Sequence, residues 1–247
     1  MAGLSPINPQ DIALFPTQVR ILRWQTEKGF NERLSDICAE LFERAIKGKQ
    51  PYHTYNLWRY EFPEFADLRR MFEQAMRAYI EAHMNPRIIE HHDYRMHAWL
   101  RIDDPKEVIA PHTHPDVHVV GTYYSRVEIA ARKRAALPPG RGSDGRKDME
   151  GDLVLLDPRP GVKLGFEKSR EATYAITPEA GMMVLIPCFL GHWVNPVSEG
   201  DRRICIANNM TLSRRAPIGV SGSFRSGRLA SRVGQAGAPS KVADSQV

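Results

Sequence analysis

The chain has 247 residues, of which 42% are hydrophobic and 26% are charged, a balance that is ordinary for a globular protein. This length fits one large domain and is sufficient to bury a sizeable core. No window approaches about eighteen consecutive apolar residues, so no membrane-spanning segment is expected.

The formal net charge is +5 and the pI is about 9.2, which raises the question of nucleic-acid binding. Much of the excess positive charge lies in residues 126–147, around Arg132-Lys133-Arg134, and in the segment after Thr211. Neither stretch interleaves the aromatic side chains that stack on bases. We therefore expect a solvated loop and tail and no nucleic-acid partner, with polyanion binding as the alternative.

The cysteine pattern bears on the compartment. Cys38, Cys188 and Cys205 are odd in number, widely spaced and mostly in apolar surroundings, so a disulfide framework is not expected. The first residues lack the basic start and apolar run of a secretory signal peptide. These features predict a cytoplasmic protein.

Two amphipathic helices are expected in the N-terminal third of the chain. Residues 31–49 carry apolar side chains three and four positions apart, and Asn31 is a suitable N-cap. A second helix is predicted to begin at Pro63, a favoured first-turn residue, and to end before Pro86. Residues 12–22, which precede both helices, have a strand-like pattern.

From Arg87 onward the helical spacing of apolar residues is replaced by short apolar runs separated by Gly, Pro and Asp. This pattern is typical of a β-sandwich or barrel, so the fold class is mainly β with flanking helices. The expected strands are residues 94–102, 119–127, 152–156, 172–176, 182–187 and 203–210. Residues 126–150 are expected to form an insertion that is either a lid or a tolerated surface loop, and residues 212–247 a basic tail without structure of its own.

The segment around His112 and His114 carries the main chemical signal. In an extended chain these two side chains project to the same face, where two imidazoles can hold a divalent transition metal. Pro115 would end regular pairing just after them. An alternative pair with the same spacing is His114 and Asp116, in which case His112 would only support the ligands.

The remaining candidates come from distant segments. His192 follows the apolar run 182–186 and stands among large apolar groups, so it is the expected third ligand. Arg203 opens a later strand, and its planar guanidinium suits bidentate capture of a carboxylate. Arg202 competes for this role, because strand alternation lets only one of the two face inward.

Several motifs occur in the same order as in a known superfamily. They are Phe15-Pro16-Thr17, His112-Thr113-His114-Pro115 leading to Gly121-Thr122-Tyr123-Tyr124, Gly151-Asp152-Leu153 with Asp157-Pro158-Arg159, Ile186-Pro187 with His192-Trp193-Val194 and Pro196, and Arg203-Ile204-Cys205-Ile206-Ala207. Together they resemble the 2-oxoglutarate/Fe(II) oxygenase superfamily, most closely its group with an HxHP…GvYY core.

The resemblance implies a double-stranded β-helix, a cupin-like jelly roll, within one domain over residues 12–211, with helices at about 31–84 and the β-core at about 87–211. It implies iron held by His112, His114 and His192, which favours this pair over the alternative with Asp116. It further implies that Arg203 grips the distal carboxylate of 2-oxoglutarate with help from Tyr124.

Two departures from the family pattern stand out. The usual metal triad is two histidines and one carboxylate, whereas the residue two after His112 is another histidine. The family's Arg-x-Ser is Arg203-Ile204-Cys205, and a thiol is a weaker hydrogen-bond partner than a hydroxyl.

The function implied is that of a non-haem iron(II), 2-oxoglutarate-dependent dioxygenase that hydroxylates an unactivated C–H bond. Fe(II), 2-oxoglutarate and O2 would be required, and ascorbate would stimulate turnover. The substrate would be a small molecule or a peptide, and a homodimer is compatible with the sequence. The alternatives are a cupin-type metal enzyme without 2-oxoglutarate, and a basic non-catalytic binding protein.

Overall fold

The protein is described by a computed structural model that covers residues 15–47, 56–85, 87–103, 109–129, 150–159 and 172–215. Most of the expected insertion at 126–150, and all of the expected tail beyond Arg215, lie outside these residues. No helix within the described ranges is long and apolar enough to cross a membrane.

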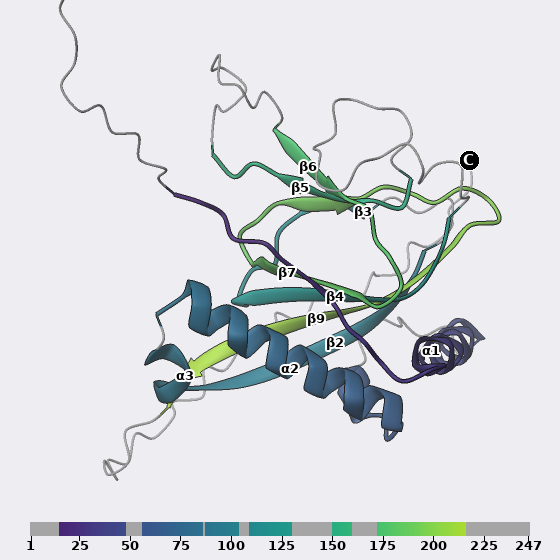
Figure 1. The fold of residues 1–247 in the computed structure, drawn as a ribbon, viewed down its shortest axis with the longest axis horizontal. Helices are drawn as coiled ribbons and strands as arrows, with labels where there is room; N and C mark the ends of the chain where they lie inside the picture. Colours follow the sequence, from purple (N-terminus) through teal and green to yellow (C-terminus); the bar gives the residue numbers. More distant parts are fainter. Residues whose placement is uncertain are drawn as a thin grey trace, which may run out of the picture. The chain divides into compact units, whose positions relative to one another are not determined.

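Two antiparallel sheets form the body of the protein (Figure 1). The five-stranded sheet has the order β1 (Arg20–Arg23), β7 (Met182–Pro187), β4 (Val119–Glu128), β9 (Arg202–Arg214) and β2 (His92–Ile102). The four-stranded sheet has the order β3 (Ile109–His112), β8 (His192–Val194), β5 (Leu153–Leu156) and β6 (Thr173–Ile176). Apart from the consecutive strands β5 and β6, neighbours within each sheet are not consecutive in the chain, as in a jelly roll, and the expected mainly β class is confirmed.

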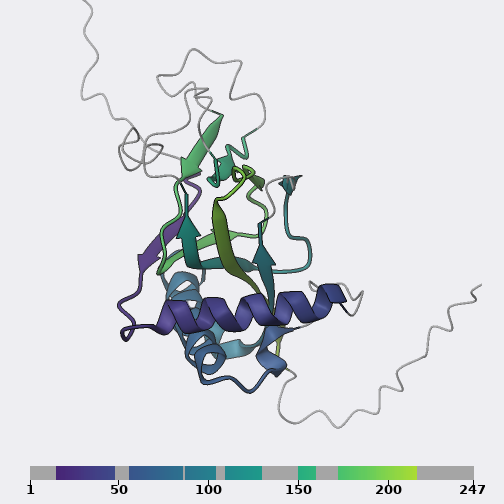
Figure 2. The same ribbon diagram turned by 90° about the vertical axis from the view of Figure 1, so that its right-hand side faces the viewer.

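The helices cover the outer face of the five-stranded sheet (Figures 1 and 2). They are α1 (Phe30–Lys47), the 3-10 helix η2 (Leu57–Arg59), α2 (Pro63–His83) and the short α3 (Arg87–His91). Phe72 and Met76 of α2 are fully buried in the same apolar cluster as Leu185 of β7 and Ile206 of β9. The three-and-four spacing of the α2 sequence therefore places its apolar stripe on the sheet.

A second apolar cluster lies between the two sheets. It contains Val120 and Tyr124 from β4, Leu155 from β5, Ile186 from β7 and Cys205 from β9. Side chains alternate between the faces of a strand, so neighbouring residues of β9 belong to different clusters. This alternation decides which side chains can reach a site inside the sandwich.

Two expectations about local structure need correction, and two strands were not expected. The first helix begins at Phe30, so Asn31 is not its N-cap; the Asn31 Oδ1 accepts a hydrogen bond from the Tyr123 hydroxyl at 2.6 Å. Strand β9 continues to Arg214, because its last residues pair with the start of β2, and the expected tail therefore contributes its first three residues to the sheet. The strands β3 and β8 are short and had no strong pattern of their own.

Gly121 marks the closest approach between helix α2 and the sheet. A Cβ at this position would lie 2.8 Å from Leu185 Cδ2 and 2.9 Å from both Met76 Cε and Phe72 Cε1. All three neighbours are fully buried, so none can move without disturbing others. We expect Gly121→Ala to lower the free energy of unfolding by about 1–3 kcal/mol, measured by denaturant unfolding. An unchanged midpoint would show that this interface is looser than described.

Candidate metal centre

His112 and His192 are brought together by strand pairing. β3 and β8 are antiparallel neighbours, and His112 is the register partner of His192. Their ring centroids are 4.4 Å apart. Eighty residues of chain separate them in sequence, and the four-stranded sheet places them side by side.

His114 completes the group from the segment just after β3. Its backbone N–H donates to the Cys188 carbonyl at 3.0 Å, which ties this segment to the end of β7. Its ring lies parallel to that of His192, with centroids 5.2 Å apart, and is stacked at 6.0 Å on Trp99 of β2. One nitrogen from each of the three histidines lies within 4.8 Å of the others, close enough for all three to hold one ion.

Two of the three rings are oriented by backbone carbonyls. His112 Nδ1 lies 2.9 Å from the Ala110 carbonyl, and His192 Nδ1 lies 2.9 Å from the Leu190 carbonyl. A carbonyl can only accept, so each Nδ1 carries the proton and each Nε2 keeps a free lone pair. Metal-binding histidines are oriented in this way in proteins, so the donor set fits a divalent metal.

Burial keeps the inner rings neutral. Desolvation, with smaller contributions from His192 and His112, lowers the pKa of His114 to about 4. Burial also lowers the pKa of His192. The neutral imidazole is the form that binds a metal, so near neutral pH no proton has to leave these two rings first.

Asp116 stands apart from this group. It lies in an exposed turn with a positive φ of 63°, and it does not belong to the cluster that the three histidines form. The alternative ligand pair of His114 and Asp116 therefore has no support among the described residues.

Arg203 faces the interior of the sandwich and Arg202 is exposed, as strand alternation requires. The Arg203 side chain is 1% exposed; its Nε donates to the Asp103 carboxylate and its Nη1 to the Gly151 carbonyl. Its Nη2 makes no hydrogen bond to the described residues. The pair with Asp103 outweighs the desolvation cost and raises the pKa of Arg203, so the guanidinium stays charged.

Tyr124 lies beside Arg203 in the second apolar cluster. It is 1% exposed, and burial raises the pKa of its phenol, so the hydroxyl keeps its proton. That hydroxyl makes no hydrogen bond to the described residues. An uncharged O–H donor and a guanidinium with a nitrogen to spare thus lie together, an arrangement that suits a carboxylate.

Sequence reasoning missed three side chains at this site. Asp103 holds Arg203, Trp99 stacks on His114, and Asn209 of β9 contacts His114. The alternation of side chains along β2 and β9 could have indicated them, because these residues lie on the same face of the sheet as Arg203. Arg159, by contrast, forms an ion pair with Asp157, Nη2 to Oδ2 at 2.6 Å.

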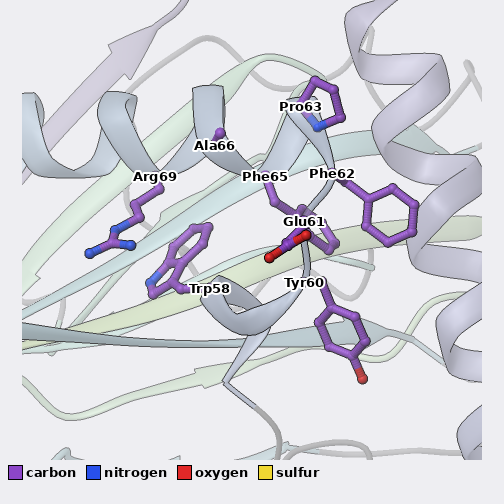
Figure 3. Close-up of a pocket in the computed structure, with 8 residues that line it drawn as sticks. All are labelled: Trp58, Tyr60, Glu61, Phe62, Pro63, Phe65, Ala66 and Arg69. Carbon is purple, nitrogen blue, oxygen red and sulfur yellow. The ribbon is translucent and has the colours of Figure 1, made fainter.

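One surface groove lies elsewhere. It has a volume of about 490 Å³, and its lining includes Trp58 of η2 and, from the connection between η2 and α2, Tyr60 and Phe62 (Figure 3). Trp58 Nε1 donates to Asn208 Oδ1, on the face of β9 that the helices cover. The groove is therefore on the opposite face of the five-stranded sheet from the histidines.

Residues 97–209 match a family model described as "Putative 2OG-Fe(II) oxygenase". The matched span contains the three clustered histidines and Arg203. This match covers a little under half of the chain and relates its core to the 2OG-Fe(II) oxygenase family. The family implies iron(II) and 2-oxoglutarate as cofactors, and the predicted double-stranded β-helix and enzyme class are confirmed.

The fold of this oxygenase is similar to that of the non-haem α-ketoglutarate-dependent epimerase SnoN from nogalamycin biosynthesis, with a TM-score of 0.50, 11% identity and 83% of each chain covered. A Pseudomonas putida prolyl-4-hydroxylase is 14% identical, with a TM-score of 0.49 over 81% of this chain and 88% of that chain. HygX from Streptomyces hygroscopicus, with nickel and 2-oxoglutarate bound, is 13% identical, with a TM-score of 0.48 over 79% of this chain and 82% of that chain. No curated protein matches the sequence.

Proposed function

We propose that the oxygenase holds iron(II) with His112, His114 and His192, and binds the distal carboxylate of 2-oxoglutarate with Arg203 and Tyr124. The reaction is the oxidation of a C–H bond of a small-molecule or peptide substrate, with hydroxylation as the expected outcome. The single observation that carries this proposal is the convergence of the three histidine nitrogens within 4.8 Å.

The metal ligands differ in charge from the family's usual set. Two histidines and a carboxylate leave a divalent ion with one net positive charge, whereas three neutral imidazoles leave it with two. 2-Oxoglutarate would therefore supply the first negative charge to this site. We expect the absence of a carboxylate ligand to favour binding of the doubly anionic cosubstrate.

The interior charges support the role of Arg203. The Asp103 carboxylate holds the guanidinium in place through Nε and neutralises it, so a buried arginine is tolerated before the cosubstrate binds. The Nη2 of Arg203 can then donate a hydrogen bond to the distal carboxylate of 2-oxoglutarate, and the Tyr124 hydroxyl can donate a second one. Arg101 Nε also donates to Asp103, at 3.0 Å, so this acid is shared by two arginines.

The chain's own contribution to the reaction is binding, orientation and exclusion of water. The histidines fix the ion at one end of the sandwich, and Arg203 would fix the far end of 2-oxoglutarate between the sheets. Apolar side chains such as Leu155 and Ile186 make this space dry, which strengthens each polar contact. The oxidising chemistry itself is supplied by the iron with 2-oxoglutarate and dioxygen.

We further propose a cytoplasmic location, which the thiols support. Cys38, Cys188 and Cys205 are all free, and the first and last are buried. Burial raises the pKa of Cys38 and of Cys205 to about 12, so neither is a reactive thiolate. These features support a reducing compartment, and hence a cytoplasmic location.

The proposed function is tested by turnover without added substrate. Purified protein with iron(II), ascorbate, 2-oxoglutarate and air is expected to form succinate slowly, and this formation should stop when iron is omitted or chelated. Succinate would be measured by mass spectrometry. Metal-loaded protein that neither binds 2-oxoglutarate nor forms succinate would contradict the proposal.

A further inference from the structure

The third histidine of the cluster lacks the support that the other two have. His112 and His192 each place Nδ1 on a backbone carbonyl two residues earlier in the chain. His114 makes no such bond, although it lies between Trp99 and His192. Stacking fixes the plane of a ring but leaves open which ring nitrogen carries the proton. A different group must determine the tautomer of His114.

Asn209 is placed to do this. It lies on β9, where its register partners are His97 on β2 and Val120 on β4. The segment that follows His114 is attached beside it, because the His118 backbone N–H donates to the Met210 carbonyl at 2.9 Å. Asn209 therefore lies on the part of β9 to which the segment after His114 is hydrogen-bonded.

The Asn209 side chain carries an oxygen without a partner. Among the described residues its Oδ1 is buried and accepts no hydrogen bond. An unpaired buried acceptor costs about 1–3 kcal/mol, so such a group in a folded protein needs an explanation. The Asn209 side chain interacts with the ring of His114, so this unpaired oxygen lies near a ring whose N–H has no backbone partner. His97 makes no hydrogen bond to Asn209.

We propose that Asn209 is a positioning residue of the metal centre: its Oδ1 accepts the ring N–H of His114 and so directs the other ring nitrogen to the metal. This inference rests on the proposed function, because it requires that His114 be a ligand. It also assigns a role to Trp99, whose ring holds the plane of the imidazole while Asn209 fixes its rotation. Two ligands are thus oriented by the backbone, and one by a side chain that mutation can remove.

The adjacent Asn208 offers a matched control. It is fully buried on the opposite face of β9, where its Oδ1 accepts from Trp58 Nε1 at 2.9 Å and its Nδ2 lies 3.2 Å from Met76 Sδ. Asn208→Leu removes polar contacts from the helix side of the sheet and none from the histidines. It should lower stability without changing metal affinity.

The experiment measures the dissociation constant of cobalt(II), with its visible absorption as a second readout of ligand geometry. We expect Asn209→Leu to weaken binding about 10- to 100-fold and to alter the absorption. Asn209→Asp, which keeps an oxygen acceptor, should bind within about threefold of wild type or more tightly. Circular dichroism would show that each variant is folded.

The outcomes separate this inference from the proposed function. If wild type binds cobalt, His114→Ala does not, and Asn209→Leu binds within twofold of wild type, the role of Asn209 is wrong and the site stands. An Asn209→Asp variant as weak as Asn209→Leu would likewise refute the hydrogen bond and leave only packing. Failure of the folded wild-type protein to bind cobalt would overturn both.

Discussion

Replacing His192 with alanine is expected to abolish metal binding by the oxygenase. His192 is a buried ring at the centre of the site, 4.4 Å from His112 and 5.2 Å from His114 between ring centroids. Its removal leaves two ligands, one of them exposed, and so a site open to water. We expect a loss larger than the roughly 10- to 100-fold that follows loss of a supporting residue. Equilibrium dialysis with iron(II) or manganese(II) would measure it.

The control for His192→Ala is His91→Ala. His91 is exposed at the end of α3, where it lies 3.9 Å from the Glu90 carboxylate. This variant removes a histidine without touching the cluster, so metal stoichiometry and affinity should be unchanged. Retention of one tightly bound ion by folded His192→Ala protein would remove His192 from the ligand set.

Replacing Arg203 with methionine is expected to weaken 2-oxoglutarate binding strongly while metal binding persists. A hydrogen bond to a charged group contributes about 1.5–3 kcal/mol, which corresponds to an increase of roughly 10- to 150-fold in the dissociation constant. Calorimetry on manganese-loaded protein under anaerobic conditions would measure it. Arg202→Met is the matched control, because Arg202 is exposed on the other face of β9.

Arg203→Met is also expected to lower the free energy of unfolding, and the experiment must distinguish this loss from weaker 2-oxoglutarate binding. The variant leaves Asp103 buried without its main partner, and breaking a buried ion pair from one side costs about 3–5 kcal/mol. The double variant with Asp103→Asn removes the unpaired charge, so it should recover part of the stability and none of the 2-oxoglutarate affinity. Wild-type affinity for 2-oxoglutarate in either variant would make Arg203 a purely structural residue and would place the carboxylate-binding group elsewhere.

The parts of the fold that the sequence predicts are those that local pattern determines. The run at 182–187 is continuously apolar, and β7 covers these same residues because the strand is buried on both faces. Pro63 is the first residue of α2, since proline suits the first turn of a helix. The predicted N-cap role of Asn31 is wrong because its side-chain oxygen accepts a hydrogen bond from Tyr123, 92 positions later in the chain.

In the candidate site, too, local sequence pattern predicts some features, and others depend on contacts between distant residues. Alternation around His112 and His114 predicted that their side chains would meet, and they do so with ring centroids 5.1 Å apart. The partnership of His112 with His192 depends on the register of two short strands that had no clear signal. The choice between Arg202 and Arg203 depended on which of the two consecutive side chains of β9 faces the interior. The roles of Asp103 and Asn209 depend on long-range contacts, which a single sequence does not reveal.

The most direct test of the account is a crystal structure of the protein with manganese(II) and 2-oxoglutarate. We predict one ion bound by a nitrogen from each of His112, His114 and His192 at about 2 Å, with the distal carboxylate of 2-oxoglutarate on Arg203 Nη2 and the Tyr124 hydroxyl. An ion held by Asp116 in place of His112, or 2-oxoglutarate bound away from Arg203, would contradict it.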